Sequence, residues 1–413
     1  MTTATDAPPE PPAEPPEAEE GRPRDGAAAR ALALLKAAGN ALLIPFLALV
    51  TALAIGGLVI IFTTPDVLSQ WNSFIADPVG ALQASWDVVY EAYHALWQSS
   101  LGSAHALGRT LTEATPLALT GLSVALAFKA GLFNIGAAGQ LVIGATCAGW
   151  VGFTWDLPAP IHLPLAILAG FAGGAAWGSI AGVLKARTGA HEVITTIMLN
   201  YISYNLLNYA LRSDAFQPAG RDDLISKAVK PSARLPNYNF GELTVNAGLF
   251  LAIAAAVIVW WLLERSTVGF RLKAVGANPF ASRYAGMSVG AIYILAMLLA
   301  GGLAGLGGTV NILGRPSFSL TGQYYFFLGF DGIAVALLAR ANPIGVLGAA
   351  FLFGVLRSGS TGMQAATSTP VDIILVIQAL IILFVAAPAM VRAIYRIKAG
   401  RGTGATFTTS WGS

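Results

Sequence analysis

Few side chains in this sequence have types and spacing that could support catalysis or metal binding. His191 and Glu192 open the segment HEVITTIMLNY, but an H-E-x-x-H zinc motif needs a second histidine where Thr195 stands. We therefore expect Glu192 to lie in the first turn of a helix, where the helix dipole favours an acid. The four histidines are scattered and no G-x-x-x-x-G-K-[ST] loop occurs, so we predict no enzyme, no ATPase, no metal and no cofactor.

One carboxylate lies inside an apolar stretch. The segment GFDGIAVALL, from Gly329 to Leu338, contains Asp331, and an acid at membrane depth is by default a candidate for function. The alternative is that Asp331 caps the half-helix IAVALL, with Gly329 and Gly332 allowing the chain to break before it. Capping is the favoured interpretation, and a capped break would expose a helix N-terminus toward a ligand.

Amides and aromatic rings supply the other candidates for ligand contact. The segment GLFNIGAAGQ, from Gly131 to Gln140, indicates either a cavity wall or a glycine-rich packing surface with satisfied amides. The run from Tyr324 to Phe327 is either an interfacial aromatic belt or a set of stacking faces for a planar ligand. The predicted ligand path is lined by Phe133, Asn134, Gln140, Gln323, Tyr325 and Asp331.

These residues need a membrane scaffold to hold them. The chain has 413 residues, of which 55% are hydrophobic and 11% charged, with a mean hydropathy of +0.65. Soluble domains carry about 25% charged residues, so this composition predicts an all-α polytopic membrane protein. The single cysteine, Cys147, excludes an intramolecular disulfide. We expect ten spans, near 41–62, 112–128, 132–153, 164–184, 193–211, 247–264, 288–309, 324–339, 343–358 and 371–389.

The distribution of Lys and Arg predicts the orientation of these spans. With the N-terminus inside, 16 of the 24 basic residues fall on the cytoplasmic side, so both termini are expected there. Residues 1–40 are expected to form a disordered Pro/Glu-rich cytoplasmic tail, 41–389 the transmembrane domain and 390–413 a second cytoplasmic tail. The loop 212–246 is expected outside although it holds five basic residues. A net charge of +3 does not imply a nucleic-acid partner.

Three further patterns concern how the spans pack and where they end. GQLVIGA at Gly139 and GQYYFFLG at Gly322 each precede a glycine-studded helix that begins with proline, at Pro164 and Pro343. This indicates inverted-topology repeats at 112–211 and 288–389, although chance similarity is an alternative. The segment with Trp71, Trp86, Tyr90, Tyr93 and Trp97 predicts an interfacial amphipathic helix. Close helix packing is predicted at Gly170, Gly174, Gly178 and Gly182.

The segment 265–287 separates two apolar stretches and is expected to be a short polar helix that docks a soluble partner. It is rich in small residues, and from Thr267 to Gly290 it carries bases but no acid. Asn278 with Pro279 is expected to start a short helix turn. Gly276 is expected to allow close approach of the partner, so that Gly276→Leu separates that contact without disturbing the spans. The predicted docking residues are Arg271, Lys273, Gly276, Asn278, Tyr284 and Gly286.

Four motifs together resemble one family of membrane proteins. GLFNIGAAGQ, HEVITTIMLNYI, GFRLKAVGANPFASRYAG and GFDGIAVALLARANPIG are similar to segments of the permease subunits of bacterial ABC importers for nucleosides and simple sugars. The branched-chain amino acid permeases are more distant relatives. The resemblance runs from about Ala114 to the last span. One departure from the nucleoside branch is Ala138, where that branch often has Glu.

The resemblance implies a fold, a function and a set of partners. It implies a type II importer-like permease in the cell (cytoplasmic) membrane, forming the translocation path for a nucleoside or simple sugar. It also implies a second permease subunit, two cytoplasmic ATPase domains, an extracytoplasmic substrate-binding protein and surrounding lipid, with 265–287 as the coupling helix. The alternatives are an ion-coupled secondary transporter and an ABC permease for branched-chain amino acids. A secondary carrier has no need of a docking helix.

Overall fold

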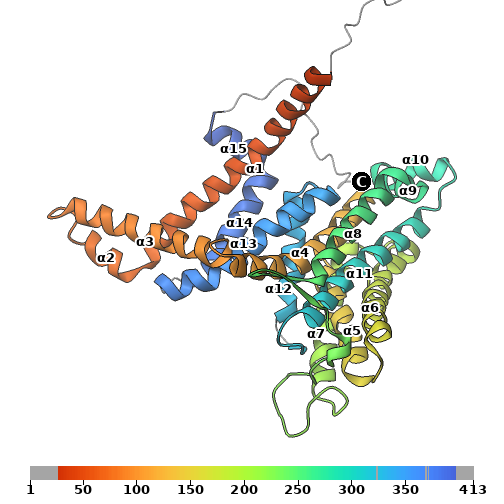
Figure 1. Cartoon of the computed structure of the whole chain (residues 1–413). Coiled ribbons are helices and arrows are strands. Elements are labelled where there is room, and N and C mark those ends of the chain that lie inside the picture. The colour runs from red at the N-terminus through yellow and green to blue at the C-terminus, as the bar shows by residue number, and fades with distance from the viewer. Residues whose placement is uncertain (1–26, 322–323, 368–369, 371, 397–413) are drawn as a thin grey trace, which may run out of the picture. The chain divides into compact units, whose positions relative to one another are not determined.

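The computed structural model describes residues 27–321, 324–367, 370 and 372–396, which are mostly helical (Figure 1). The chain divides into two compact units after Ile44, and the described part of the first unit is the beginning of α1. The elements are α1 (Ala27–Thr63), α2 (Pro65–Trp71), α3 (Pro78–Ser100), α4 (Ala104–Lys129), α5 (Ala137–Thr154), α6 (Ala159–Thr188), α7 (Glu192–Leu211), the 3-10 helix η1 (Pro231–Ala233), β1 (Asn237–Phe240), β2 (Leu243–Asn246), α8 (Ala247–Arg265), α9 (Thr267–Ala277), α10 (Pro279–Tyr284), α11 (Val289–Gly314), α12 (Tyr324–Leu338), α13 (Pro343–Thr367), α14 (Asp372–Ala386) and α15 (Pro388–Ile394).

Seven helices of the described chain are long and apolar enough to cross a membrane: the part Pro45–Thr63 of α1, and α4, α5, α6, α8, α11 and α13. This confirms the prediction of an all-α polytopic membrane protein. The apolar parts of α12 and α14, Leu328–Leu338 and Asp372–Val385, are shorter, and α7 is not among the seven. Ten spans and inverted repeats therefore stay predictions.

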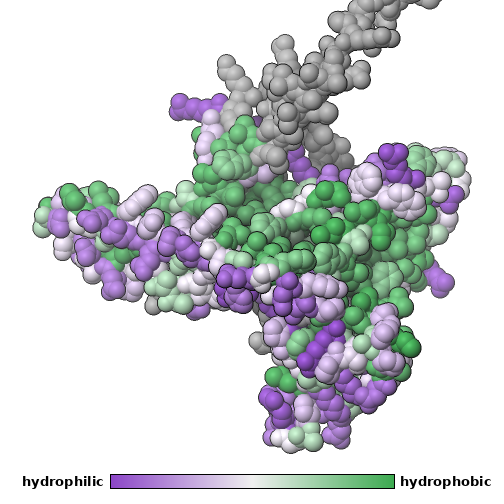
Figure 2. All heavy atoms as spheres, in the orientation of Figure 1, coloured by the Kyte–Doolittle hydropathy of each residue, from purple (hydrophilic) through white to green (hydrophobic). Residues whose placement is uncertain are grey.

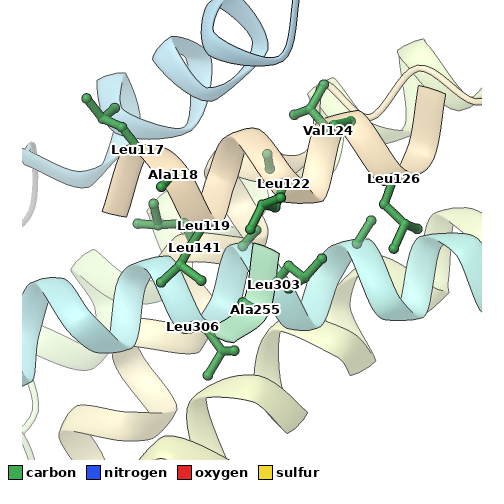
Figure 3. Close-up of a cluster of buried hydrophobic side chains, with 14 of the residues drawn as sticks. Leu117, Ala118, Leu119, Leu122, Val124, Leu126, Leu141, Ala255, Leu303 and Leu306 are labelled. Atoms are coloured by element: carbon green, nitrogen blue, oxygen red, sulfur yellow. The ribbon is translucent and has the colours of Figure 1, made fainter. Parts of the chain in front are cut away.

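The core of the second unit is built around α11, which packs against α4, α5 and α6. Burial of leucine and alanine side chains along these helices excludes both water and lipid from their contacts. Figure 3 shows this cluster, with Leu117 and Leu122 of α4, Leu141 of α5 and Leu303 and Leu306 of α11. Apolar side chains also dominate the outer surface over the middle of these helices (Figure 2).

Glycines bring α6 and α11 into backbone contact. A Cβ atom added to Gly174 would lie 2.3 Å from the Gly301 carbonyl oxygen, and one added to Gly178 would lie 2.4 Å from the Met297 oxygen. Membrane helices lack a hydrophobic force between them and gain instead from such close packing. The predicted role of the glycine stripe in α6 is confirmed.

The starts of three helices differ from their expected positions. α4 begins at Ala104 rather than near 112, and α6 begins at Ala159, so Pro164 lies inside that helix and does not lead it. α1 begins at Ala27, so the segment 27–40, expected as part of a disordered tail, is helical. A helix continues past the membrane-embedded apolar run wherever capping and propensity permit, so apolar runs alone misplace its start.

The two ends of the bundle carry different structures. At one end of α8 and α11 lie α9 and α10, and at the other lies the segment 212–246 with η1 and the antiparallel hairpin β1–β2 (Figure 1). The backbone of Ser226 pairs with Leu320, which ties this segment to the connection between α11 and α12. The segment predicted as one amphipathic helix forms two helices: Trp71 ends α2, and the other four aromatic residues lie in α3, which begins at Pro78 after Asp77 accepts a capping hydrogen bond from the Gly80 amide. Its position in the membrane interface stays a prediction.

Candidate functional site

The amides predicted to line a path form a closed pair. Asn134 lies in the connection between α4 and α5, and Gln140 lies in the first turn of α5; both are buried. The Asn134 amide nitrogen donates to the Gln140 oxygen at 2.8 Å, and the Gln140 nitrogen donates back at 3.0 Å. Asn134 also donates to Ser123 Oγ of α4 at 3.1 Å. In this conformation the pair holds α4 and α5 together, because each amide satisfies the other.

Neighbouring groups reinforce the same connection. Asn200 of α7 accepts from the Gly139 amide at 2.8 Å and donates to the Ile135 carbonyl at 2.9 Å. The Phe133 ring packs against Phe128 with 5.0 Å between their centroids. Gln323 lies outside the described residues, and for Tyr325 only the backbone, in the first turn of α12, is described. Their part in the ligand path stays a prediction.

Asp331 does not cap a half-helix, so that interpretation is wrong. α12 runs without a break from Tyr324 to Leu338. It contains Gly329 and Gly332, at which the chain was expected to break before the half-helix. Those glycines permit close packing instead: a Cβ atom at Gly329 would lie 2.1 Å from Ala138 Cα, and one at Gly332 would lie 2.7 Å from Thr120 Cβ. α12 therefore packs closely against α5 and α4, and Asp331 lies in the middle of this helix.

Asp331 belongs to a network of four alternating charges that sequence reasoning missed. Arg357 of α13 donates from Nη1 to Asp331 Oδ2 at 3.0 Å, and its Nε lies 3.5 Å from Glu113 Oε2 on α4. Arg315, directly after α11, donates to the same Glu113 carboxylate. The four side chains are between 17% and 24% exposed. We call Glu113, Arg315, Asp331 and Arg357 the charged tetrad.

The charged tetrad joins α4 to α12, to α13 and to the end of α11, three consecutive helices that lie far from α4 in the sequence. Its two acids and two bases cancel in charge, as is required of ionisable groups at membrane depth. Beside it, Arg315 and the buried Asn311 line a narrow polar hollow with Thr112, Thr115 and Asn246. The Asn311 amide nitrogen is buried without a hydrogen-bond partner among the described residues. In this conformation the hollow is too narrow to admit a water molecule, and its polar side chains hold the helices in register.

A signal for the tetrad was present in the sequence. Arg357 falls within the expected span 343–358, where an arginine needs a partner of opposite charge. Asp331 in the preceding span was the available carboxylate. Glu113 stands at the edge of its expected span, so its depth was not evident from hydropathy.

The expected docking segment forms two helices with defined caps. Ser266 accepts from the Gly269 amide at 3.0 Å to begin α9, and Asn278 accepts from the Ala281 amide at 2.9 Å to begin α10, with Pro279 in the first position. The predicted helix turn at Asn278 is confirmed. Gly286 follows α10 with φ +80°, a conformation that favours glycine.

The outer face of α9 and α10 carries exposed aromatic rings and an exposed base. Tyr284 is 95% exposed, Phe270 and Phe280 are also exposed, and Arg271 lies beside them. Lys273 instead forms an ion pair within the same chain, with its Nζ 3.2 Å from Oε1 of Glu264 on α8. Large exposed apolar side chains are common where a protein binds a partner or a membrane.

Gly276 faces the protein's own helices. A Cβ atom there would lie 2.3 Å from the Lys129 carbonyl oxygen and 2.8 Å from the Gly131 nitrogen, at the turn between α4 and α5. The expectation that Gly276→Leu leaves the spans undisturbed is therefore wrong, because leucine would push α9 away from that turn. The same contact connects α9 mechanically to the turn that leads to Asn134.

Known proteins with similar sequences can now be compared. Residues 106–386 match the family described as Branched-chain amino acid transport system / permease component. The chain is similar to the guanosine ABC transporter permease protein NupP of Bacillus subtilis, with 39% identity over 355 residues, 85% of this chain and 94% of that protein. It is also similar to the nucleoside ABC transporter permease protein NupB of Lactococcus lactis subsp. cremoris, with 41% identity over 306 residues, 71% of this chain and 82% of that protein.

A third relative is named for glucose. The glucose ABC transporter permease protein TsgB13 of Haloferax volcanii is 34% identical over 352 residues, 82% of this chain and 86% of that protein. No solved structure matches the chain. The family match covers most of the spans, and the three relatives are permease proteins over most of their own length. This chain therefore belongs to the family of branched-chain amino acid transport system permease components, as a permease subunit of an ABC transporter.

Proposed function

We propose that this chain forms the membrane path by which an ABC importer carries a nucleoside or a simple sugar into the cell. The observation that carries the proposal is the similarity to NupP, which extends over 94% of that guanosine permease protein. The nucleoside relative NupB and the glucose relative TsgB13 support the same class of hydroxyl-rich, uncharged cargo. NupP and NupB, at 39% and 41% identity, are more similar to this chain than TsgB13, at 34%, which favours a nucleoside.

The path itself is proposed to run between the halves of the bundle. Its lining is proposed to include Phe133, Asn134, Gln140, Gln323, Tyr325 and Asp331, with the charged tetrad toward the extracytoplasmic end. The support is that the tetrad keeps part of its surface exposed at membrane depth and offers both donors and acceptors. Opening of this path would require the Asn134–Gln140 pair to separate.

Energy is proposed to arrive through α9 and α10 from a separate ATPase chain. The docking surface is proposed to consist of Arg271, Asn278, Tyr284 and Gly286, with the exposed Phe270 and Phe280 added. Support comes from the contact of Gly276 with the α4–α5 turn, since movement of α9 would be transmitted to that turn. Lys273 is proposed to orient α9 through Glu264.

The remaining parts of the importer follow from this arrangement. Both termini are proposed to lie in the cytoplasm, with ten spans in 41–389 and tails at 1–40 and 390–413. The segment 212–246 is proposed to lie outside, where an extracytoplasmic binding protein delivers the cargo. A second permease subunit, identical or different, is proposed to complete the path.

Uptake by a reconstituted importer tests the proposal. The chain would be placed in proteoliposomes with its cognate ATPase and binding protein, and uptake of radiolabelled guanosine, adenosine and glucose would be measured with and without ATP. We expect ATP-dependent uptake of at least one of these compounds. Uptake that follows a proton or sodium gradient without ATP would instead support an ion-coupled carrier.

A further inference from the structure

The connection between α11 and α12 is fastened to the segment that carries η1 and the β1–β2 hairpin. We call residues 315–321 of this connection the strap, and residues 212–246 the lobe. The backbone amide of Ser226 in the lobe donates to the Leu320 carbonyl of the strap at 3.1 Å. Ser226 Oγ in turn accepts from the Leu320 amide at 2.8 Å. The strap therefore lies directly against the lobe and is bonded to it from both sides of one residue pair.

Phe318, in the middle of the strap, is held in a strained conformation. Its φ is +45°, in the left-handed region where a bulky side chain is rarely found. Two contacts from the lobe hold it there: the Val229 amide donates to its carbonyl at 2.8 Å, and the Arg234 guanidinium lies 4.1 Å from the centre of its ring. Arg234 Nε also donates to the Val229 carbonyl at 2.9 Å. We call Val229, Arg234 and Phe318 the clamp, because backbone strain persists only where surrounding contacts enforce it.

The strap begins at a member of the charged tetrad. Arg315 is the first residue of the strap, and it donates to the Glu113 carboxylate of α4. Its carbonyl accepts from the Phe318 amide at 3.0 Å, which closes a four-residue turn. Arg315 and Phe318 thus belong to one turn, so movement of that turn would carry Arg315 away from α4. The clamp and the tetrad are therefore the two ends of one short connection.

The hollow beside Arg315 is closed in this conformation. Its walls include Thr115 of α4 and Asn311 of α11, and it is too narrow to admit a water molecule. Asn311 is 4% exposed, and its amide nitrogen has no hydrogen-bond partner among the described residues. A buried donor without a partner destabilises the state that contains it, and entry of water would remove this cost. The closed state therefore carries two local costs, the strain at Phe318 and the unsatisfied amide, that opening would relieve.

We propose that the strap is a gate at the lobe end of the path, and that the clamp holds it shut. When the lobe moves away, Phe318 relaxes, Arg315 separates from Glu113, and water reaches Asn311 through the opened hollow. Arg234 is a positioning residue in this arrangement, because it acts on Arg315 through Phe318. The inference rests on the proposed transport path, since it assigns the gate to the side of the membrane on which the lobe lies.

The reactivity of a cysteine in the hollow measures whether this gate is open. In a Cys147→Ala background, the full-length Thr115→Cys chain would be placed in nanodiscs, where both faces of the protein are accessible. Its rate of reaction with a charged methanethiosulfonate reagent would then be measured. Thr115 is 2% exposed, so the reaction should be slow. Arg234→Gln should raise the rate at least fivefold, because it removes the guanidinium from the Phe318 ring.

Two controls separate opening of the gate from unfolding. Arg221→Gln makes the same change at an exposed arginine of the lobe, which pairs with Asp223, and should alter the rate less than twofold. Thr120→Cys is the matched reporter, because Thr120 is fully buried on the same helix and, like Thr115, donates to a backbone carbonyl of that helix. It should stay unreactive in Arg234→Gln. Reaction of Thr120→Cys in that variant would mean a general loosening of the bundle and would overturn the proposal.

A double variant tests whether the clamp and the ion pair act on one element. Arg315→Gln should also raise the rate at Thr115→Cys at least fivefold. Arg234→Gln with Arg315→Gln should react no faster than the faster single variant, because both changes release the same strap. Rate increases that multiply, or an unchanged rate in Arg234→Gln, would overturn the proposal. The measurement needs no ATPase, binding protein or cargo, so its outcome is separate from the outcome of the uptake experiment.

Discussion

Arg357 on α13 donates to the Asp331 carboxylate on α12 at 3.0 Å, while its Nε lies 3.5 Å from Glu113 on α4. A single guanidinium therefore joins the consecutive helices α12 and α13 to α4, which lies far from them in the sequence. Hydrocarbon offers a charged group no hydrogen bonds, and these ion pairs supply such bonds within the protein. The contact fixes the position of α12 against α13 more narrowly than apolar packing alone would.

Loss of the arginine should destabilise the folded chain. Removing one partner of a buried ion pair costs about 3–5 kcal/mol, because the other charge is left unpaired. The cost of Arg357→Gln should lie at or below the lower end of this range, since the Arg357 and Asp331 side chains remain 24% and 17% exposed. Thermal unfolding in detergent would measure the loss, and ATP-dependent uptake should fall with it.

A double variant separates charge pairing from other effects. Arg357→Gln combined with Asp331→Asn removes both charges and should regain part of the stability that the single variant loses. Arg221→Gln is the matched surface control: its pair with Asp223 is about half exposed, and such pairs contribute about 0–1 kcal/mol. If the double variant is no more stable than Arg357→Gln, Asp331 is not the partner that requires the arginine.

The amide pair allows a structural role to be distinguished from ligand contact. Gln140→Ala leaves Asn134 buried with lost hydrogen bonds, which should cost about 1–3 kcal/mol of stability. Thermal unfolding in detergent would be measured alongside uptake. Asn205→Ala is the control, because Asn205 is exposed and donates to the Tyr201 carbonyl of its own helix. Reduced uptake with an unchanged unfolding temperature would show that Gln140 contacts the cargo instead.

Much of the fold could be predicted from the sequence because hydropathy and glycine spacing act locally. Apolar runs marked the seven helices that are long and apolar enough to cross a membrane, and glycines four residues apart marked the α6 surface that meets α11. Asn278 and Pro279 likewise identified a helix start from two adjacent residues. Each of these signals depends on neighbours within one or two turns, so no knowledge of the tertiary arrangement was needed.

Tertiary contacts account for what the sequence did not reveal. Gly329 and Gly332 were taken for a helix break, but they allow α12 to approach Ala138 and Thr120, which lie on other helices. Gly276 lies in a segment whose composition is typical of a docking surface. It faces the α4–α5 turn instead, because α9 packs closely against that turn. Glycine frees the backbone and also permits close packing, and only the position of the neighbouring helix decides between the two.

The orientation of the chain can be tested by cysteine labelling. In a Cys147→Ala background, Asp222→Cys should react with an impermeant thiol reagent added outside the cell. Asp222 is preferable to its neighbour Asp223, which accepts two hydrogen bonds from Arg221, at 2.8 and 2.6 Å. Ala277→Cys, exposed on α9, should react only after the membrane is disrupted. The reverse pattern would invert the proposed topology.

Alkaline pH should weaken the contact between α1 and α3. Burial raises the pKa of Tyr93 to about 12, whereas a tyrosine in the unfolded chain ionises at about 10. Because the pKa of Tyr93 is higher in the folded chain than in the unfolded chain, its neutral phenol contributes its full share of the folding stability below pH about 10. This contribution is lost as the pH rises toward 12. The stability difference between the wild-type chain and Tyr93→Phe should therefore shrink across this range.

Thermal unfolding at a series of pH values would show this change. Val89→Ala is the control, because Val89 has no ionisable group and lies on α3 next to Gly57 of α1. Its stability difference from the wild-type chain should not vary between pH 10 and 12. A constant difference for Tyr93→Phe would mean that its hydroxyl is accessible to base in the folded chain.

The coupling surface is best tested at a residue that touches nothing in its own chain's core. Tyr284 is 95% exposed at the end of α10. Substitutions at such surface positions change the folding free energy by about 0.5 kcal/mol or less. Tyr284→Ala should therefore leave the unfolding temperature unchanged within about 1 °C. If α9 and α10 dock the ATPase, co-purification with that ATPase and stimulated ATP hydrolysis should fall several-fold, because exposed aromatic rings are common energetic anchors of interfaces. Gly276→Leu provides the contrast: it should lower the unfolding temperature, since its side chain would collide with the Lys129 carbonyl. Normal co-purification and normal stimulation in Tyr284→Ala, Phe280→Ala and Arg271→Glu alike would mean that the ATPase docks elsewhere on the cytoplasmic side.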